Sequence, residues 1–271
     1  MSPDQTLLLF DGVDKDDVDA ARWVCARCGM TQSGDARFCP FDGEPLLAHS
    51  PERGVPELTG RVLDGRYRIL GVVGSGTMGT VYRAEHVTLG RQLAVKVLRP
   101  ELAREPLLAE QFLLEARVAA SIDHPAVVAI TDFGQLPSGE PYFVMELLEG
   151  VQLSRLVRQK GPLTLPAAVS VLHSVADALR AAHALGHLHR NLRIHNVLVG
   201  RMGRGLWTKV LDFGLARVAG RSSLTRASGL YGDPRYLSPE EIGGAAGDAL
   251  SDVYGFGLLA FEVTTGRAAF E

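Results

Sequence analysis

The chain has 271 residues, of which 46% are hydrophobic and 22% charged, and its formal net charge is -3. This size predicts one full domain plus a small module, and the charge gives no electrostatic basis for binding nucleic acid or an anionic membrane. No apolar run is long enough to span a bilayer, and the acidic N-terminus is not that of a signal peptide. The three cysteines, an odd number, suit a secreted disulfide framework poorly, so we expect a cytoplasmic protein.

The composition divides the chain into four segments. Residues 1–20 are acidic and are expected to form a flexible arm. Residues 21–47 hold all three cysteines and are expected to form a compact module. Residues 48–64 contain the prolines and glycines that suit a linker. Residues 65–271 hold the remaining motifs and are expected to form the main domain.

The small module contains two pairs of potential metal ligands. Cys25 and Cys28 form one pair, Cys39 and Asp42 form the other, and each pair precedes a glycine that can take the positive φ of a tight turn. Zinc takes four ligands and accepts a carboxylate oxygen beside thiolates. The spacing therefore predicts a Cys3Asp Zn²⁺ site with a structural or interaction role, with His49 as the competing fourth ligand. The alternative is a tail of reduced cysteines without metal, but so small a unit would then lack the metal cross-link that it needs to fold.

A glycine-rich turn lies between two predicted strands. Residues 67–73 read as the first strand, and the G-x-G-x-x-G pattern of Gly74, Gly76 and Gly79 follows it. A dinucleotide-binding fold would place a helix after these glycines, but residues 81–86 read as a second strand. Strand, glycine turn and strand together indicate a lid over phosphates, where backbone amides approach the ligand closely.

A lysine on the next strand has a candidate carboxylate partner on the following helix. Lys96 lies in the strand sequence Ala-Val-Lys-Val, placed to hold the α- and β-phosphates of a nucleotide. The helix is predicted from a stripe with spacings of four and three: Leu108, Phe112, Glu115, Ala119 and Ile122. A carboxylate inside an apolar stripe is costly unless it is paired. We therefore predict an ion pair between Lys96 and Glu115.

Residues 189–196 read HRNLRIHN, which has the spacing of the catalytic loop H-R-D-L-x-x-x-N. Asp212-Phe213-Gly214 and Ser238-Pro239-Glu240 follow it. In this order the motifs resemble the bacterial family of eukaryotic-like, or Hanks-type, Ser/Thr protein kinases, from about Tyr67 to Glu271. The segment before them resembles the zinc ribbons attached to bacterial kinase-like proteins.

The resemblance implies an α+β, two-lobed protein-kinase-like fold with an N-lobe over 65–146 and a C-lobe over 147–271, preceded by the zinc ribbon. The C-lobe is expected to be truncated, because typical members continue with further helices. The implied cofactors are ATP and Mg²⁺, with Asn196 and Asp212 as the magnesium ligands. Asp252 matches the aspartate that anchors the catalytic loop in this family.

The resemblance also implies how the nucleotide is held. Met145 is the expected gatekeeper, and backbone groups from Glu146 to Leu148 are expected to hydrogen-bond adenine. The apolar side chains expected to sandwich the base are those of Val81, Ala94, Leu198 and Leu211. The complete set of implied nucleotide-binding positions is Gly74, Gly76, Gly79, Val81, Ala94, Lys96, Glu115, Met145, Glu146, Leu148, Leu198, Asn196 and Asp212.

The departures from the family pattern gather on the phosphoryl-transfer side. Asn191 stands at the position of the catalytic base, and Arg193 replaces a lysine that would touch the γ-phosphate. Ile194 and His195 replace a proline and a glutamate, so recognition of a basic substrate peptide is not expected. Asp233 replaces a threonine that bonds to the catalytic aspartate in the family. Its carboxylate is a candidate acceptor for the amide protons of Asn191.

These departures predict an ATP-binding pseudokinase that acts in phospho-signalling through protein partners, without nucleic acid or membrane. One alternative is a weakly active Ser/Thr kinase, because phosphoryl transfer depends mostly on positioning and charge stabilisation. Another is an adaptor whose zinc ribbon carries the function beside an inert kinase-like domain. His183, His187 and His195 are not expected to form a metal site and are predicted to be ordinary surface or loop histidines.

Overall fold

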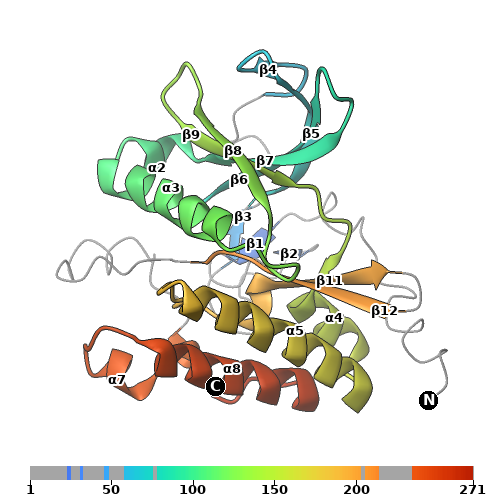
Figure 1. Ribbon diagram of the computed structural model, residues 1–271, viewed down its shortest axis with the longest axis vertical. Coiled ribbons are helices and arrows are strands. Elements are labelled where there is room, and N and C mark those ends of the chain that lie inside the picture. The colour runs from blue at the N-terminus through green and yellow to red at the C-terminus, as the bar shows by residue number, and fades with distance from the viewer. Residues whose placement is uncertain are drawn as a thin grey trace. The chain divides into compact units, whose positions relative to one another are not determined.

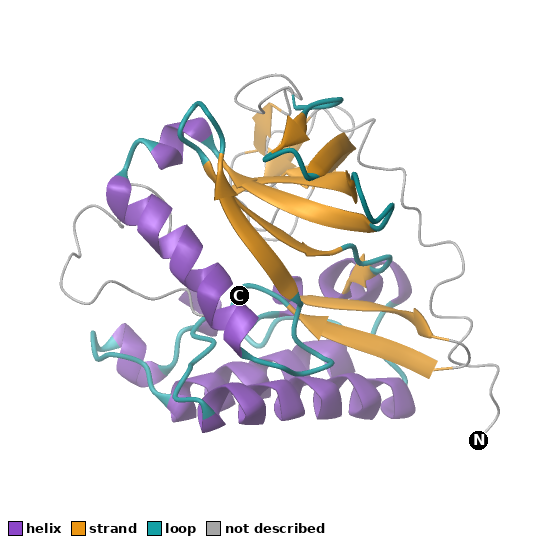
Figure 2. Cartoon of the chain, turned by 45° about the horizontal axis from the view of Figure 1, so that its top comes forward, coloured by secondary structure: helices purple, strands orange, loops and turns teal. Residues whose placement is uncertain are grey.

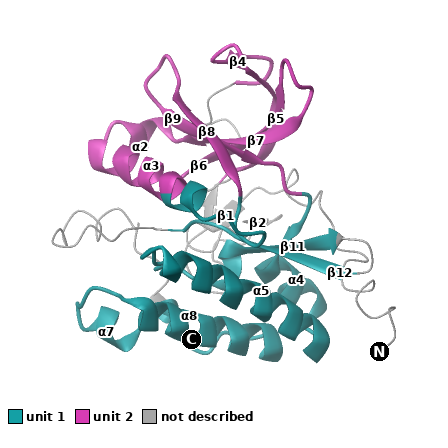
Figure 3. Ribbon diagram, viewed as in Figure 1, with its two compact units in different colours: residues 1–13, 118–128, 149–271 teal, residues 14–117, 129–148 magenta. Residues whose placement is uncertain are grey.

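The computed structural model describes residues 23–25, 31–32, 46–48, 58–75, 78–202, 205–213 and 234–270. The described residues fall into two compact units (Figure 3). Unit 2 takes those within 14–117 and 129–148, and unit 1 takes those within 118–128 and 149–271. Unit 2 is built mainly of strands and unit 1 mainly of helices (Figure 2).

The expected zinc module contains a small antiparallel sheet. Its strands are β1 (Trp23–Cys25), β2 (Thr31–Gln32) and β3 (Leu46–Ala48), in the order β2-β1-β3. The register pairs Trp23 with Gln32 and Cys25 with Leu46. Of the predicted zinc ligands, Cys28, Cys39, Asp42 and the alternative His49 lie outside the described residues, and only the backbone of Cys25 is described.

Unit 2 is built around a six-stranded sheet in which all pairs of neighbouring strands are antiparallel (Figure 1). The strand order is β4-β5-β6-β7-β9-β8. The strands are β4 (Val62–Leu63), β5 (Tyr67–Ser75), β6 (Gly79–His86), β7 (Gln92–Leu98), β8 (Ile130–Gln135) and β9 (Pro141–Glu146). Buried positions alternate with less buried ones over residues 67–70 of β5 and 80–85 of β6, as expected for strands with one face on a core.

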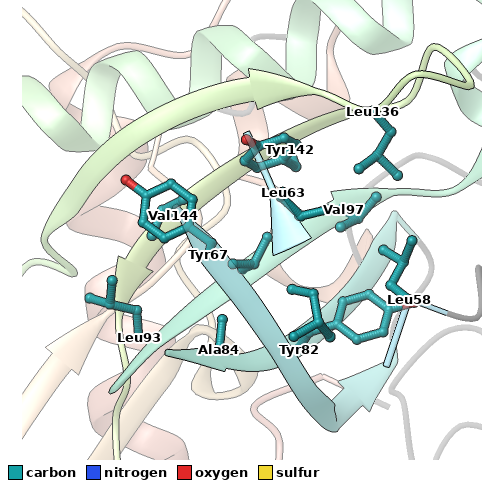
Figure 4. Close-up of a cluster of buried hydrophobic side chains, with 12 residues drawn as sticks. Leu58, Leu63, Tyr67, Tyr82, Ala84, Leu93, Val97, Leu136, Tyr142 and Val144 are labelled. Atoms are coloured by element: carbon teal, nitrogen blue, oxygen red, sulfur yellow. The ribbon is translucent and has the colours of Figure 1, made fainter. Parts of the chain in front are cut away.

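The residues just before the main domain are part of its core. Leu58 is 3% exposed and packs with Leu63, Tyr67 and other buried side chains of the sheet (Figure 4). The backbone N–H of Gly60 donates to the carbonyl of Ile69 at 2.9 Å. The core of the main domain therefore includes Leu58, which lies inside the segment 48–64 that the sequence predicted as linker.

Helices α2 (Pro100–Ala103) and α3 (Pro106–Ser121) follow β7. The predicted stripe of α3 is confirmed, because Phe112 is fully buried and Glu115 is 4% exposed. Phe112 packs with Leu98, Ala116 and Phe143, and its ring centroid lies 5.0 Å from that of Phe143. A helix face made of apolar side chains around one carboxylate thus packs on the sheet.

Unit 1 contains the longer helices and a second, three-stranded sheet. Its helices are α4 (Leu153–Lys160), α5 (Leu165–Ala184), α7 (Pro239–Ile242) and α8 (Ala249–Thr265). Its strands are β10 (Val151–Gln152), β11 (Val197–Met202) and β12 (Gly205–Val210), and its short 3₁₀ helices are η1 (Ile194–Asn196) and η2 (Pro234–Tyr236). Among the described helices none combines the length and apolar character needed to cross a membrane.

Candidate active site

The two described glycines of the glycine-rich turn have different surroundings. A Cβ atom added to Gly79 would lie 2.3 Å from the carbonyl oxygen of Val97, so β6 can approach β7 only because this residue has no side chain. A Cβ added to Gly74 would meet nothing within 4 Å. Gly79 is therefore required by the sheet itself, whereas a side chain at Gly74 would meet no described atom within 4 Å. Gly76 lies outside the described residues.

Four of the predicted nucleotide-binding residues share one face of the sheet. Val81 pairs with Lys96 across β6 and β7, and Ala94 pairs with Met145 across β7 and β9. Directly opposed residues point to the same face, as do residues two apart on one strand. The register therefore brings Val81, Ala94, Lys96 and Met145 together, although they are spread over sixty-odd positions of the chain. Their contact with a base stays a prediction.

The predicted ion pair between Lys96 and Glu115 is present. Lys96 Nζ lies 3.8 Å from Glu115 Oε1, and the two side chains are 16% and 5% exposed. The ammonium group also lies 5.6 Å from the ring centroid of Phe143. Burial makes the pair less sensitive to salt than a surface pair. A lysine ammonium held in place by a buried carboxylate has the charge needed to contact a phosphate.

The segment predicted to bind adenine has one backbone group already engaged in a hydrogen bond. The N–H of Glu146 donates to the carbonyl of Ala129 at 3.0 Å, and Glu146 Oε1 accepts from the N–H of Ala129 at 2.7 Å. This N–H is therefore not available to a base. Leu148 follows β9, whereas Leu198, on β11, and Leu211, after β12, belong to unit 1.

In unit 1, Asp252 on α8 holds the catalytic loop by its backbone. Asp252 is 2% exposed, and its carboxylate accepts from the N–H groups of His189 and Arg190, each at 2.8 Å. Arg190 takes a φ of 61°, a conformation that a non-glycine residue adopts at some cost. The anchoring role that the family resemblance implied for Asp252 is confirmed.

The prediction that His183 is an ordinary surface histidine was wrong. His183 Nε2 lies 2.7 Å from Asp252 Oδ2, and the two side chains are 23% and 2% exposed. His183 lies near the C-terminal end of α5. Its role could not be found from sequence because it depends on the packing of α5 against α8, which no local pattern encodes.

The loop itself is closed by contacts between its own residues. Asn196 is 4% exposed, and its Nδ2 donates to the carbonyl of Asn191 at 2.8 Å. The N–H of Asn191 donates to His189 Nδ1 at 3.3 Å. Burial lowers the pKa of His189, so the ring is neutral and can accept this bond. The ring lies 4.6 Å from that of Phe213. Residue 191 is thus held where a catalytic base would stand, and it carries an amide.

The residues predicted to hold magnesium are compatible with that ion. The N–H of Leu211 donates to the carbonyl of Asn196 at 2.8 Å, which brings the next residue, Asp212, beside Asn196. Asp212 has a φ of 59°, another unusual conformation at a predicted functional position. Because Asn196 uses its Nδ2 toward Asn191, its side-chain oxygen remains as the ligand. A carboxylate and an amide oxygen are hard ligands of the kind Mg²⁺ prefers.

Of the two further positions predicted to be catalytic, Arg193 and Asp233, the structure describes only Arg193. Arg193 precedes η1, and its Nε is buried with no hydrogen-bond acceptor among the described residues. Asp233 and Gly214 lie outside the described part of the chain. Beyond them, Glu240 Oε1 accepts from Ser251 Oγ at 2.6 Å, a bond that holds the pKa of Glu240 below its usual value.

Comparison with known proteins identifies the class. Residues 67–271 match the family described as protein kinase domain, so the chain belongs to the protein kinase family. Among its relatives, it is 42% identical over 214 residues to the serine/threonine-protein kinase pkn2 of Myxococcus xanthus, covering 78% of this chain and 25% of the relative. It is 37% identical over 214 residues to PrkC of Bacillus subtilis (strain 168), covering 79% and 32%.

A third relative extends the similarity. The serine/threonine-protein kinase Pkn1 of Myxococcus xanthus is 40% identical over 258 residues, covering 91% of this chain and 36% of the relative. Residues 67–271 alone cannot supply such coverage, so the match continues into the residues before Tyr67. The chain spans a quarter to about a third of the length of these three relatives.

The fold is shared with a solved kinase structure. The crystal structure of the Mycobacterium tuberculosis PknI kinase domain matches with a TM-score of 0.61 and 27% sequence identity. The match covers 79% of this chain and 80% of that chain. The predicted α+β protein-kinase-like fold is therefore confirmed.

Proposed function

We propose that this chain is an ATP-binding, protein-kinase-like signalling protein whose phosphotransfer is impaired, that is, a pseudokinase. One observation carries the proposal: the catalytic loop is anchored by Asp252 and closed by Asn196, yet residue 191 within it is an asparagine. The scaffold for a base is intact while the proton acceptor is absent from that residue. An amide cannot take a proton from a substrate hydroxyl at neutral pH.

Nucleotide binding is supported by two groups of residues, one in each unit. The buried pair of Lys96 and Glu115 supplies a fixed cation for phosphates, and Asn196 with Asp212 supplies oxygen ligands for Mg²⁺. Bound magnesium would neutralise phosphate charge. Open space at Gly74 suits a ligand that approaches the backbone closely. The function of these residues in the proposal is to bind and orient a nucleotide.

The expected loss of phosphotransfer rate is small enough to allow a second candidate function. General-base catalysis contributes about 10²–10⁴-fold, or about 3–5 kcal/mol of barrier. Positioning and charge stabilisation supply most of the rate of phosphoryl transfer, and Lys96 is in place for them. A weakly active Ser/Thr kinase is therefore the alternative that the same geometry favours. The relatives pkn2 and Pkn1 are named as serine/threonine-protein kinases, which supports this alternative.

A single preparation can test both candidates. ATP–Mg²⁺ binding is measured as a thermal shift, and phosphotransfer is measured with radiolabelled ATP. Binding with transfer reduced to background supports the pseudokinase, and robust transfer by the unaltered chain contradicts it. Absence of an ATP shift favours the adaptor alternative.

The amide at residue 191 can be tested through its proposed partner. Asn191→Asp alone is expected to restore little transfer, because two carboxylates would then face each other if Asp233 lies opposite, and one would tend to stay protonated. Asn191→Asp with Asp233→Thr is expected to exceed the sum of the single changes, which a double-mutant cycle measures. Equal activity of the single and double variants would show that the two residues are not coupled.

We also propose a zinc ribbon in residues 21–47 with Cys25, Cys28, Cys39 and Asp42 as ligands. The three-stranded sheet and the extent of the Pkn1 match support a structured module before the kinase domain. Elemental analysis of protein purified without added metal should find one Zn²⁺ per chain, and its absence in protein with reduced thiols would contradict the site. An adaptor function carried by this module is the remaining alternative. We also propose that the protein acts in the cytoplasm and through protein partners in phospho-signalling.

A further inference from the structure

We propose that Trp207, on β12, is a positioning residue that fixes the end of the segment predicted to bind adenine. This segment, residues 146–151, leads from β9 into β10 and is called the connector below. The inference deepens the proposed function and rests on it, since it names a residue that shapes the nucleotide site without touching the nucleotide. The residues that carry it, from Gly150 onward, belong to unit 1.

The first observation is how closely the indole of Trp207 approaches the connector. A Cβ atom added to Gly150 would lie 2.6 Å from Trp207 Cη2 and 2.6 Å from the carbonyl oxygen of Val199. Real Cβ atoms do not come so close to other atoms, so residue 150 can occupy this place only because it has no side chain. The indole and the backbone of β11 therefore define where Gly150 lies.

The second observation is that the same ring packs on another glycine. The three atoms nearest to a Cβ added to Gly200 all belong to Trp207, at 2.3 Å for Cε2, 2.3 Å for Cζ2 and 2.5 Å for Nε1. Gly200 and Trp207 are directly opposed across β11 and β12. A glycine inside a strand often marks a close approach of this kind. Because neither glycine has a side chain, the ring can lie against both backbones at once.

The third observation places the indole on the face of the sheet that carries Leu198, a residue predicted to contact the base. Gly200 lies two residues after Leu198 on β11, and residues two apart on a strand share a face, as do directly opposed residues. Gln152, which follows the connector, pairs with Leu198. Within unit 1, Trp207 thus lies beside two parts of the proposed site, the end of the connector and the face of Leu198.

A fixed connector matters because its backbone groups are expected to hydrogen-bond adenine. A segment that is ordered before the ligand arrives does not lose conformational freedom on binding, which strengthens the affinity. Glycine loses more freedom than any other residue when it is ordered, and Gly150 is the connector residue that the indole holds. Ordering the backbone of one residue corresponds to about tenfold in affinity. Trp207 would therefore strengthen nucleotide binding from a distance.

The first test is amide hydrogen exchange over residues 147–152, measured on the full chain without nucleotide. Trp207→Ala should raise the exchange rate there about tenfold, and Trp207→Phe, which keeps a ring, should raise it less. Gly200→Ala should also raise it, although residue 200 lies outside the connector, because the added methyl group displaces the indole. The matched control is Gly247→Ala, whose Cβ would meet the side chain of Glu241 at 2.8 Å and which should leave the connector unchanged. Circular dichroism confirms that the variants fold.

A double-mutant cycle tests whether the indole transmits the effect of Gly200→Ala. Once Trp207 is replaced by alanine, the added methyl group meets no ring. The double variant should therefore exchange no faster than Trp207→Ala alone. Additive effects would mean that Gly200→Ala loosens the connector by another route, and would overturn the proposal. If Trp207→Ala does not fold, Trp207→Leu, which keeps more apolar volume, takes its place in the cycle.

The second test adds the nucleotide. The chain has two tryptophans, so in a Trp23→Phe background the fluorescence emission reports Trp207 alone. We expect ATP–Mg²⁺ to change this emission and Mg²⁺ alone to leave it unchanged. By isothermal titration calorimetry, Trp207→Ala should bind ATP–Mg²⁺ about tenfold more weakly. Trp207→Phe should lose less affinity, and Gly247→Ala should lose none.

Two results would overturn the proposal. One is unchanged hydrogen exchange over residues 147–152 in both Trp207→Ala and Gly200→Ala. The other is ATP that binds by calorimetry without altering the emission of Trp207 and with equal affinity in Trp207→Ala. Absence of ATP binding by the unaltered chain contradicts the proposed function alone, because the exchange measurements need no nucleotide and still decide whether Trp207 holds the connector.

Discussion

The two units hold their functional residues by different means. In unit 2, the register of an antiparallel sheet and one helix fix the side chains expected to meet the nucleotide, and the pair of Lys96 and Glu115 has the chemistry that phosphate binding requires. In unit 1, Asp252 holds the backbone of the catalytic loop, so its shape persists whichever side chain stands at residue 191. Loop geometry is therefore separable from loop chemistry. A chain can retain the fold of a catalytic site while losing one group within it.

The largest effect should come from breaking the anchor in unit 1. Asp252→Ala leaves two backbone N–H groups and His183 without their acceptor, which should lower the free energy of unfolding by about 3–5 kcal/mol. Asp248→Ala removes only the N-cap of the same helix, with an expected cost of about 0.5–2 kcal/mol. Urea denaturation measures both. Equal losses would mean that Asp252 does not hold the loop.

The corresponding change in unit 2 should affect ligand binding more than folding. Lys96→Met removes the cation that Glu115 holds, and ATP–Mg²⁺ should then bind about tenfold or more weakly, since a charge-assisted contact to phosphate is lost. Isothermal titration calorimetry measures the change. Lys160→Met, on α4, is the control and should bind ATP as the unaltered chain does. An undiminished affinity in Lys96→Met would place the nucleotide elsewhere.

The two glycines of the turn sharpen the comparison within unit 2. Gly79→Ala forces a methyl group against the backbone of Val97 and should lower the free energy of unfolding by about 1–3 kcal/mol. Gly74→Ala has room for the methyl group and should change stability by less than about 0.5 kcal/mol. Thermal melts with and without ATP–Mg²⁺ test this: Gly74→Ala should shrink the ligand-induced shift while leaving the unliganded Tm nearly unchanged. The reverse order of stabilities would contradict the assignment.

The smallest effect concerns pH and the core of the sheet. Burial, with the hydrogen bond to Asp132, raises the pKa of Tyr67 from 10.0 to about 12. The folded state thus favours the neutral phenol, so this contribution to stability is complete below pH 10 and is lost as the pH rises through about 12. Tyr67→Phe should flatten the fall in stability over that range. Tyr254→Phe, on α8, is the control and should leave it unchanged.

Local sequence patterns and the order of the motifs were sufficient to predict the elements whose apolar residues recur with helical or strand periodicity. The stripe through Glu115 gave the buried face of α3 and its pairing with Lys96, because helical periodicity and the cost of a buried charge are both local arguments. The contact between His183 and Asp252 escaped prediction, since it joins residues 69 positions apart through helix packing. The packing role of Gly79 also escaped prediction. The glycine pattern indicated a turn over phosphates, but the space for a side chain at Gly79 is taken by the backbone of Val97 on the neighbouring strand.

The ordered residues before Tyr67 have a practical consequence for dissecting this protein. A fragment that began where the family match begins, at residue 67, would lack Leu58 and Leu63 from the hydrophobic cluster and Asp64, which accepts the hydroxyl hydrogen bond of Tyr142. Its sheet would also lose β4 and expose the edge of β5. Such a fragment would be prone to aggregate for reasons unrelated to the zinc module. A fragment that starts just before Leu58 would lack the module and keep this hydrophobic cluster intact.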